Sequence, residues 1–217
     1  YAYSENFILV LSHDEVVHLK CSMLGKMPGD REDKFANLKL AYAYMCGHPG
    51  KKLLFMGQEF GQWNEWSEKR ALDWYLLEDD SHKELKDFTK ACLILNKKYR
   101  CLYETDYSPE GFRWINANDK DNSVFSFIRI SPDKKRHLLF VFNFTPVERP
   151  NHRIGVPVKG KYKLVLGDDM KNHKKTLTSV RGECDGYKES LLIDLHRYGI
   201  AVYEFNGDVN AHKPTNI

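Results

Sequence analysis

The chain has no apolar run of about 18 residues, the length that a membrane-spanning helix requires. Its first residues also lack the charged and apolar pattern of a signal peptide. Lysines and arginines are scattered and nearly balanced by acids, giving a formal net charge of +3 over 217 residues. Nucleic-acid binding usually needs a concentrated basic face. We therefore expect neither a membrane anchor nor a nucleic-acid partner.

Paired cysteines are lacking too. The five cysteines show no pairing rhythm and form no C-x-x-C motif, which argues against a cysteine zinc site. An odd number suits a reducing compartment, so we expect a cytoplasmic location. His18 and His48 have no acidic or cysteine partner at metal-ligand spacing, so we predict structural roles for both and no metal site.

The chain also lacks an initial methionine, and an apolar run begins only six residues after Tyr1. We therefore expect a piece of a longer protein. The apolar fraction of 42% and the many aromatic residues are enough for a packed core, which excludes a disordered chain.

Residues 7–11, Phe-Ile-Leu-Val-Leu, form a short apolar run without polar alternation. This pattern predicts a strand buried on both faces. Ser12-His13-Asp14-Glu15 follows directly, and charge at the carboxyl end of a parallel strand is where α/β proteins place their chemistry. His13 and Asp14 are therefore candidate functional residues. Alternatively, Asp14 caps a helical turn and His13 makes a local hydrogen bond, and the pattern alone leaves both open.

A second strand is predicted over residues 53–56, and Glu59 follows it as Asp14 follows the first. Glu59 could line a pocket, but the pattern favours a surface or hinge-capping acid. Apolar residues recur every three or four positions in 31–46 and 82–99, which predicts two amphipathic helices. Strand, loop and helix occur twice, so this region contains two βα units.

Trp63 and Trp66 lie in the irregular segment between the second strand and the second helix. Their flat rings could stack on pyranose sugars. They could also pack a long loop onto the fold, and we favour that interpretation slightly.

The periodicity changes after about residue 103. Short stretches rich in β-branched and aromatic residues follow, bounded by Gly, Pro, Asn or Asp, which predicts an antiparallel sandwich. The predicted strands are 112–115, 124–130, 137–144, 153–156, 161–166, 190–195 and 200–205, with a loop over 168–188. We expect three parts, namely residues 1–104, an all-β domain over 105–206 and a flexible tail over 207–217.

Two βα units cannot close a barrel, because a (β/α)8 barrel needs eight. A parallel pair alone would also expose ladder groups and apolar surface. The expected fold class is therefore α/β plus all-β, with the last two units of a (β/α)8 TIM barrel followed by a β-sandwich. The remaining six strands would lie upstream, outside this chain.

Several runs closely resemble the bacterial-type glycogen (1,4-α-glucan) branching enzymes of the α-amylase superfamily. The resemblance extends to about residue 205 and includes the long loop from SHDEVVH to MPGD, which a generic amylase would not share. The matching runs are Ser12–His18, Lys26–Asp30, Lys34–Leu38, Pro49–Phe60, Glu65-Trp66, Leu72–Trp74, Glu110–Ile115 and Val141–Pro146.

The resemblance implies roles for particular residues. The family's His-Asp pair at the seventh barrel strand corresponds to His13, a contact to substrate hydroxyls, and Asp14, a stabiliser of the transition state. Glu15, Glu59 and Trp63 are further candidates for substrate binding. The family's motifs for the nucleophile and the general acid/base do not occur here, so we expect the chain alone to be inactive. The implied partners are glycogen or another α-glucan and the missing part of the barrel, and no cofactor is implied.

Two positions depart from the family pattern. Leu19 stands where the family usually has Gly, and Cys21 stands where it usually has Gly or a basic residue. Because Gly permits backbone angles that Leu disfavours, Leu19 could reshape the rim of the loop. The other function that the sequence leaves open is a carbohydrate-binding or structural β-sandwich module of another amylase-type glucan hydrolase. The sequence does not indicate an oligomeric state.

Overall fold

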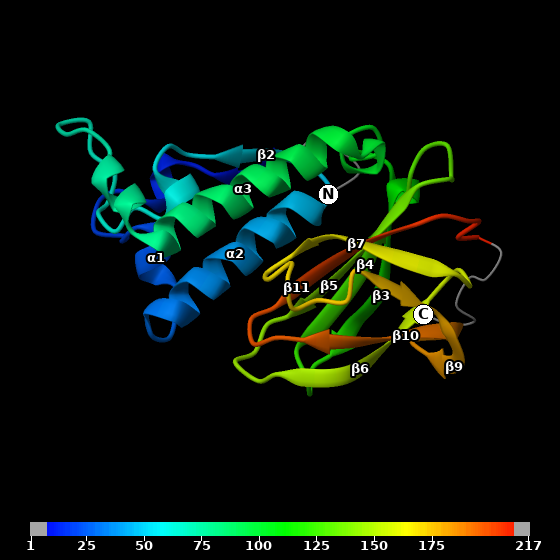
Figure 1. Cartoon of the computed structure of the whole chain (residues 1–217). Helices are drawn as coiled ribbons and strands as arrows, with labels where there is room; N and C mark the ends of the chain where they lie inside the picture. Colours follow the sequence, from blue (N-terminus) through cyan, green and yellow to red (C-terminus); the bar gives the residue numbers. More distant parts are fainter. Residues whose placement is uncertain (1–7, 211–217) are drawn as a thin grey trace.

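The computed structural model describes residues 8–210. Two long helices, α2 (Arg31–Gly47) and α3 (Asp80–Lys98), lie side by side between a small parallel sheet and a pair of antiparallel sheets (Figure 1). No helix within these residues is long and apolar enough to cross a membrane.

The small sheet consists of two parallel strands, β1 (Ile8–Leu11) and β2 (Lys51–Leu54), paired from Ile8 with Lys51 to Leu11 with Leu54. The first predicted strand is confirmed, although Phe7 lies outside the described residues. The second begins and ends two residues earlier than predicted. The Phe55 amide still donates to the Leu11 carbonyl at 3.0 Å, but the chain then turns, with Gly57 in the left-handed region.

The prediction that the first strand is buried on both faces is wrong for its described side chains. Ile8 is 51% exposed, while Leu11 and Leu54 are partly buried against a cluster that residues of α1 (Met23–Lys26), α2, α3 and the loop after β1 form. Leu53 and Met56 are exposed as well. Within the described residues the helices cover one face of this sheet, and its other face carries apolar side chains in contact with solvent.

Both predicted helices are confirmed, and their ends follow from capping. The Asp30 carboxylate accepts from the Asp33 amide at 2.9 Å and starts α2, and Asp79 caps α3 in the same way through Ser81. His48-Pro49 follows the end of α2, as expected, since a residue before Pro disfavours helical angles. The connecting segments contain α1 (Met23–Lys26) and the short 3-10 turns η1 (His13–Glu15), η2 (Gln58–Phe60), η3 (Trp74–Glu78), η4 (Arg100–Leu102) and η5 (Pro109–Gly111).

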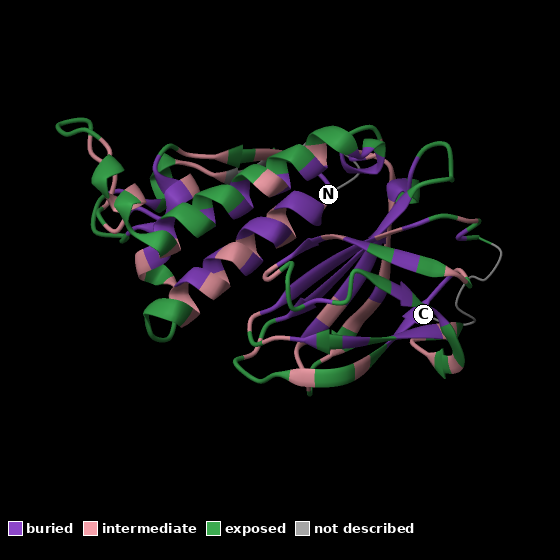
Figure 2. Cartoon of the chain, viewed as in Figure 1, coloured by how far each residue is buried: buried purple, intermediate pink, exposed green. Residues whose placement is uncertain are grey.

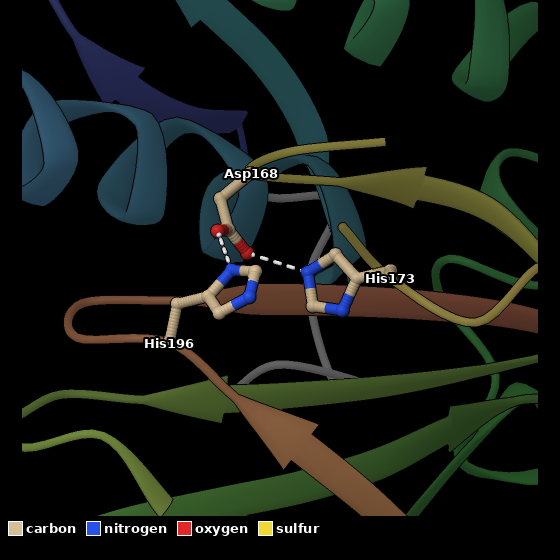
Figure 3. A group of neighbouring side chains, drawn as sticks. All are labelled: Asp168, His173 and His196. Atoms are coloured by element: carbon tan, nitrogen blue, oxygen red, sulfur yellow. Dashed lines mark hydrogen bonds and ion pairs between the residues drawn. The ribbon is translucent and has the colours of Figure 1, made fainter. Parts of the chain in front are cut away.

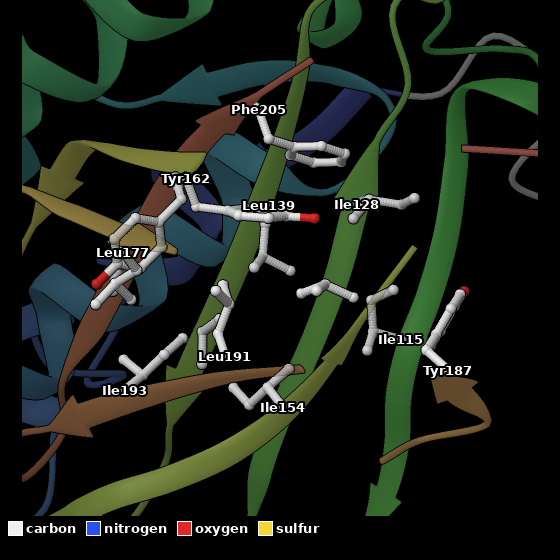
Figure 4. Close-up of a cluster of buried hydrophobic side chains, with 14 of the residues drawn as sticks. Ile115, Ile128, Leu139, Ile154, Tyr162, Leu177, Tyr187, Leu191, Ile193 and Phe205 are labelled. Atoms are coloured by element: carbon white, nitrogen blue, oxygen red, sulfur yellow. The ribbon is translucent and has the colours of Figure 1, made fainter. Parts of the chain in front are cut away.

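The predicted antiparallel sandwich is confirmed. A six-stranded sheet has the order β3-β4-β5-β11-β7-β8, and a three-stranded sheet has the order β6-β10-β9. A shared apolar core lies between them, with Ile128 and Leu139 from the larger sheet and Ile154 and Leu191 from the smaller (Figure 4). The strands are β3 (Phe112–Asp119), β4 (Val124–Arg129), β5 (His137–Asn143), β6 (Arg149–Val156), β7 (Lys161–Gly167), β8 (Thr176–Thr178), β9 (Val180–Cys184), β10 (Tyr187–Leu195) and β11 (Ile200–Phe205).

The six-stranded sheet is covered on both faces, so that every residue of β5 is buried (Figure 2). One face meets the smaller sheet. The other carries Phe127, Phe140 and Phe142, which pack against α2 and α3. Burial on both faces explains why residues 137–144 show no polar alternation, because alternation appears only where one face of a strand meets water.

A buried ion pair joins the end of α2 to the sandwich. The Arg129 guanidinium donates to Asp106 Oδ1 at 2.8 Å and to the carbonyl of Gly47 at 2.7 Å, and Lys51 Nζ lies 3.0 Å from Asp106 Oδ2. Both Arg129 and Asp106 are almost fully buried. A buried charge needs such partners to offset its lost hydration.

The loop predicted over 168–188 is only partly a loop, because it contains β8 and β9. Both strands lie at sheet edges, and most of their side chains are exposed, so the sequence carries little apolar signal there. The tail expected over 207–217 starts with a packed segment. Val209 is buried in the sandwich core, and its carbonyl accepts from Arg113 at 2.8 Å. Residues 211–217 lie outside the described residues.

Candidate functional site

His13 and Asp14 project from the carboxyl end of β1, on the 3-10 turn η1. Ser12 starts this turn, because its hydroxyl accepts from the Asp14 amide at 3.3 Å and donates to Asp14 Oδ2 at 3.2 Å. His13 Nε2 lies 3.2 Å from Asp14 Oδ1, and the two side chains are 55% and 68% exposed. The structure thus places the predicted His13 and Asp14 side chains next to each other and leaves the Asp14 carboxylate open to solvent. It also shows the local capping contacts of the alternative interpretation.

Two lysines fix the backbone of this turn. Lys20 Nζ donates to the carbonyl of Asp14 at 2.8 Å, and Lys26 Nζ donates to the carbonyl of Glu15. The carboxylate of Glu15 lies 3.4 Å from the same Lys26 ammonium and is about half exposed. Glu15 is therefore adjacent to Asp14 at the same strand end, with its charge partly neutralised.

Glu59 is used inside its own turn. It follows β2 on η2, where its carboxylate accepts from the Gly57 amide at 2.7 Å. Burial raises the pKa of the neighbouring Tyr42 hydroxyl, and the negative charge of Glu59 raises it further, so Tyr42 stays neutral and donates to the carbonyl of Gln58 at 2.8 Å. Glu59 thus holds the turn after β2 through Gly57, and both its capping role and its pocket role stay predictions.

Trp63 packs the long loop onto the helices. Its indole Nε1 lies 3.1 Å from His82 Nε2, and its ring meets Phe35 edge-on at 6.1 Å between centroids. Arg31 lies over the same ring at 5.6 Å. Trp66 meets Phe55 edge-on at 5.2 Å. Both tryptophans are partly buried, as expected for loop packing rather than for an open stacking platform.

The rim of the site is a strained loop. His18, Leu19 and Cys21 all have positive φ angles, of 56°, 67° and 65°. L-residues pay about 1–2 kcal/mol for this conformation. The Glu65 carboxylate accepts from the Leu19 amide at 3.1 Å and from the Cys21 amide at 2.7 Å. The two departures from the family pattern thus fall at positions whose backbone favours Gly.

Glu65 is a residue that the sequence reading missed. It belongs to the matching run Glu65-Trp66, and the Trp66 amide donates to the Val16 carbonyl at 3.0 Å. This pair connects the loop after β2 to the loop after β1 across more than 40 residues. An acid directly before a tryptophan was the available signal, but sequence alone does not reveal a partner so far away.

One group of metal-ligand type is found within residues 8–210, formed by Asp168, His173 and His196. It lies at the edge of the sandwich and shares no residue with the Asp14 turn. The geometry beside Asp14 is instead that of an exposed acid with an imidazole neighbour. Such a pair can bind hydroxyl groups or stabilise developing positive charge.

Residues 114–206 match the family described as the alpha amylase C-terminal all-beta domain. Over 209 residues the chain is 50% identical to the 1,4-alpha-glucan branching enzyme GlgB of Butyrivibrio fibrisolvens, which is 93% of this chain and 33% of that protein. The chain is a homologue of the bacterial branching enzymes. It is also 50% identical over 173 residues to the Aquifex aeolicus enzyme, covering 80% of this chain and 28% of that protein.

A third relative, from Bacillus cereus, is 44% identical over 209 residues, covering 93% of this chain and 32% of that enzyme. The chain thus spans about a third of the length of the branching enzymes it matches. Together with the match to an alpha amylase C-terminal domain, this supports similarity to the C-terminal part of such enzymes. The resemblance inferred from the sequence motifs is confirmed.

Proposed function

We propose that this chain supplies the end of the catalytic barrel and the all-β domain of a 1,4-α-glucan branching enzyme. Such an enzyme cuts an α-1,4 bond and transfers the released glucan segment to a 6-hydroxyl, creating an α-1,6 branch. The observation that carries the proposal is the open Asp14 carboxylate at the carboxyl end of a parallel strand, in a chain whose relatives are named branching enzymes.

Asp14 acts in this proposal as the stabiliser of the transition state. Its carboxylate accepts hydrogen bonds from sugar hydroxyls beside the reacting carbon, and these bonds strengthen as the ring flattens towards an oxocarbenium ion. Interactions that are stronger in the transition state than in the ground state raise the rate. His13 is held 3.2 Å from Asp14 and supplies a second contact to the sugar.

Glu15, Glu59 and Trp63 are assigned supporting parts. Glu15 is the most open of these three to a ligand, with its side chain 49% exposed. Glu59 shapes the turn after β2 through Gly57, and Trp63 anchors the following loop through His82. We propose that the last two act on the substrate through the shape of the loops rather than by direct contact.

The barrel assignment is also a proposal. Parallel strands in α/β proteins are normally covered on both faces, whereas here Ile8, Leu53 and Met56 expose apolar surface. Six further strands would complete the barrel, two of them would pair with the free edges of β1 and β2, and together they would cover these side chains. Retaining chemistry needs a nucleophile and a general acid/base about 5 Å apart, and the family's motifs for both are absent from the sequence. We therefore propose that residues 1–217 alone do not catalyse transfer.

A chimera tests the function. Residues 1–217 replace the corresponding part of the Butyrivibrio fibrisolvens enzyme, and new α-1,6 linkages are counted after debranching and chain-length analysis. We expect an active chimera, loss of about 100–1,000-fold or more in turnover for Asp14→Asn, and no change for the exposed control Asp87→Asn on α3. Near-normal turnover of Asp14→Asn would remove Asp14 from the mechanism.

The isolated chain is assayed under the same conditions. We expect no new branches, and any above background would contradict the proposed inactivity. The alternative of a glucan-binding module is not favoured, because Phe144 is the one exposed aromatic side chain found between residues 105 and 210. Retardation of the whole chain during electrophoresis through glycogen-containing gels would instead support the glucan-binding alternative.

The branching-enzyme proposal also includes a cytoplasmic location, since its proposed substrate is an intracellular store.

A further inference from the structure

Three side chains from two connections, the one between β7 and β8 and the one between β10 and β11, meet at one edge of the sandwich (Figure 3). Asp168 directly follows β7, His173 lies in the loop that leads to β8, and His196 directly follows β10. His173 Nε2 lies 2.9 Å from Asp168 Oδ1, and His196 Nδ1 lies 2.7 Å from Asp168 Oδ2. One ligand atom from each residue can be chosen so that all three lie within 4.8 Å of one another.

Surrounding contacts hold the Asp168 carboxylate, the His173 ring and the backbone of His196 in place. The Ile200 amide donates to Asp168 Oδ1 at 2.8 Å and orients the carboxylate. Asn143 Nδ2 donates to the carbonyl of His196 at 2.8 Å. The His173 ring rests against Gly167, where a Cβ would come within 2.8 Å of the ring carbon Cδ2. Metal ligands typically have such outer contacts, which orient them before an ion binds.

We propose that Asp168, His173 and His196 form a binding site for a divalent transition metal of the zinc class. Two imidazoles and one carboxylate are suitable ligands for Zn²⁺, whereas Ca²⁺ and Mg²⁺ prefer oxygen ligands alone. Bonds of about 2.0–2.2 Å in a tetrahedral site separate neighbouring ligand atoms by roughly 3.3 Å. The pairs at 2.7 and 2.9 Å use different oxygens of Asp168, and the chosen ligand atoms lie within 4.8 Å of one another, so binding needs side-chain shifts of at most about 1.5 Å to reach this separation.

The surroundings leave room for a fourth ligand. His173 is buried, with its side chain 2% exposed, but His196 is 28% exposed and lines an open cleft of about 560 Å³ together with Asp168 and Asp169. A water molecule from this cleft completes the tetrahedron. The ion therefore has an entry path on one side and fixed ligands on the other.

The ion would tie together the segments that contact α2. Arg197 follows His196, and its guanidinium lies 2.8 Å from Glu32 and 3.5 Å from Asp33 in the first turn of α2. Cross-linking the turn after β10 to the loop after β7 would hold Arg197 in place against the helix. The proposed role is structural, at the junction of the helices and the sandwich, and it does not depend on the proposed branching activity.

Zinc titration of the 217-residue chain by calorimetry tests the site. We expect one equivalent to bind, to raise the melting temperature, and to bind more than about 100-fold more weakly to His196→Gln and Asp168→Asn, since removing even an outer contact costs roughly 10–100-fold. The matched control is His152→Gln, from a pair in which His152 Nε2 lies 3.8 Å from Asp119. It should bind zinc like the wild type.

X-ray absorption of the zinc-loaded wild type gives a second readout that needs no variant. We expect a shell of nitrogen and oxygen atoms at about 2.0–2.1 Å with imidazole scattering and no sulfur shell near 2.3 Å. Sulfur ligands would assign the ion to the cysteines and overturn the proposal. So would an absence of binding by the wild type, or affinity that survives intact in folded His196→Gln.

Discussion

Leu19→Gly should stabilise the loop at the rim of the candidate site, although it removes an entire side chain. Leu19 has a φ angle of 67° and is 95% exposed, so its side chain contributes strain and almost no packing. Glycine adopts the same angles without a steric penalty. The amide that donates to Glu65 remains present in the variant.

The expected gain follows from two opposing effects. A left-handed L-residue costs about 1–2 kcal/mol, and relieving it favours the folded loop. Glycine also loses more conformational freedom on folding, and this destabilises the folded state by about 0.5–1 kcal/mol. The net stabilisation should be about 0.5–1 kcal/mol, which for a chain of this size raises the melting temperature by about 1–4 °C.

Two measurements report this gain. Urea unfolding followed by tryptophan fluorescence gives the global free energy of unfolding, and Trp66 lies beside the loop. Native-state hydrogen exchange of the Leu19 and Cys21 amides reports local opening, because both donate to Glu65. Protection of these amides should rise by about 2–5-fold, since 1.4 kcal/mol corresponds to a factor of ten.

Leu93→Gly is the matched control. Leu93 is also largely exposed, at 62%, but it lies inside α3, where glycine costs about 1 kcal/mol relative to a good helix former. The same substitution should therefore stabilise at position 19 and destabilise at position 93. If Leu19→Gly lowered both the unfolding free energy and the amide protection, the assignment of strain to this loop would be refuted.

Three further predictions follow from contacts described above. Glu65→Gln should abolish one of the two hydrogen bonds to the loop, because the Gln amide nitrogen cannot accept, and weaken the other; we expect a cost of about 1–2 kcal/mol and faster hydrogen exchange of Cys21, with strand amides unchanged. Arg129→Met should cost about 3–5 kcal/mol in urea unfolding, because it leaves Asp106 buried beside Lys51 alone, and adding Asp106→Leu should recover part of that loss. Burial alone would raise the pKa of Asp168, but hydrogen bonds from its two histidine partners and a backbone amide lower it overall. Its ionised form therefore stabilises the fold above about pH 4, and this stabilisation is lost in acid. Without metal, the free energy of unfolding of Asp168→Asn should therefore lie closer to that of the wild type at about pH 3 than at about pH 6.

The sequence predicted elements best where one periodicity dominates. The helix over residues 31–46 and the strand over 137–144 have strong apolar patterns and were found within one residue of the predicted ends. β8 and β9 were missed because edge strands with mostly exposed side chains carry almost no apolar signal. The second parallel strand was placed two residues late, since Phe55 and Met56 continue the apolar run after the strand has ended.

The candidate site shows the same limit. The pairing of His13 with Asp14 follows from adjacency on one turn, and the sequence could predict it. The contact between Glu65 and the loop at Leu19 and Cys21 could not be predicted, because it depends on how two long irregular segments meet. The cluster at Asp168 was missed for a similar reason, since His196 joins it from a strand end 28 residues away.

The double-sided burial of the six-stranded sheet determines where this protein can be divided. A cut near residue 105, where the composition changes, would strip away α2 and α3 and leave Phe127, Phe140 and Phe142 facing water. The severed β-domain should then precipitate or self-associate, because a broad apolar sheet face is a site of aggregation. For expression trials, and for grafting this module onto other enzymes, the natural unit starts before α2 and includes both helices.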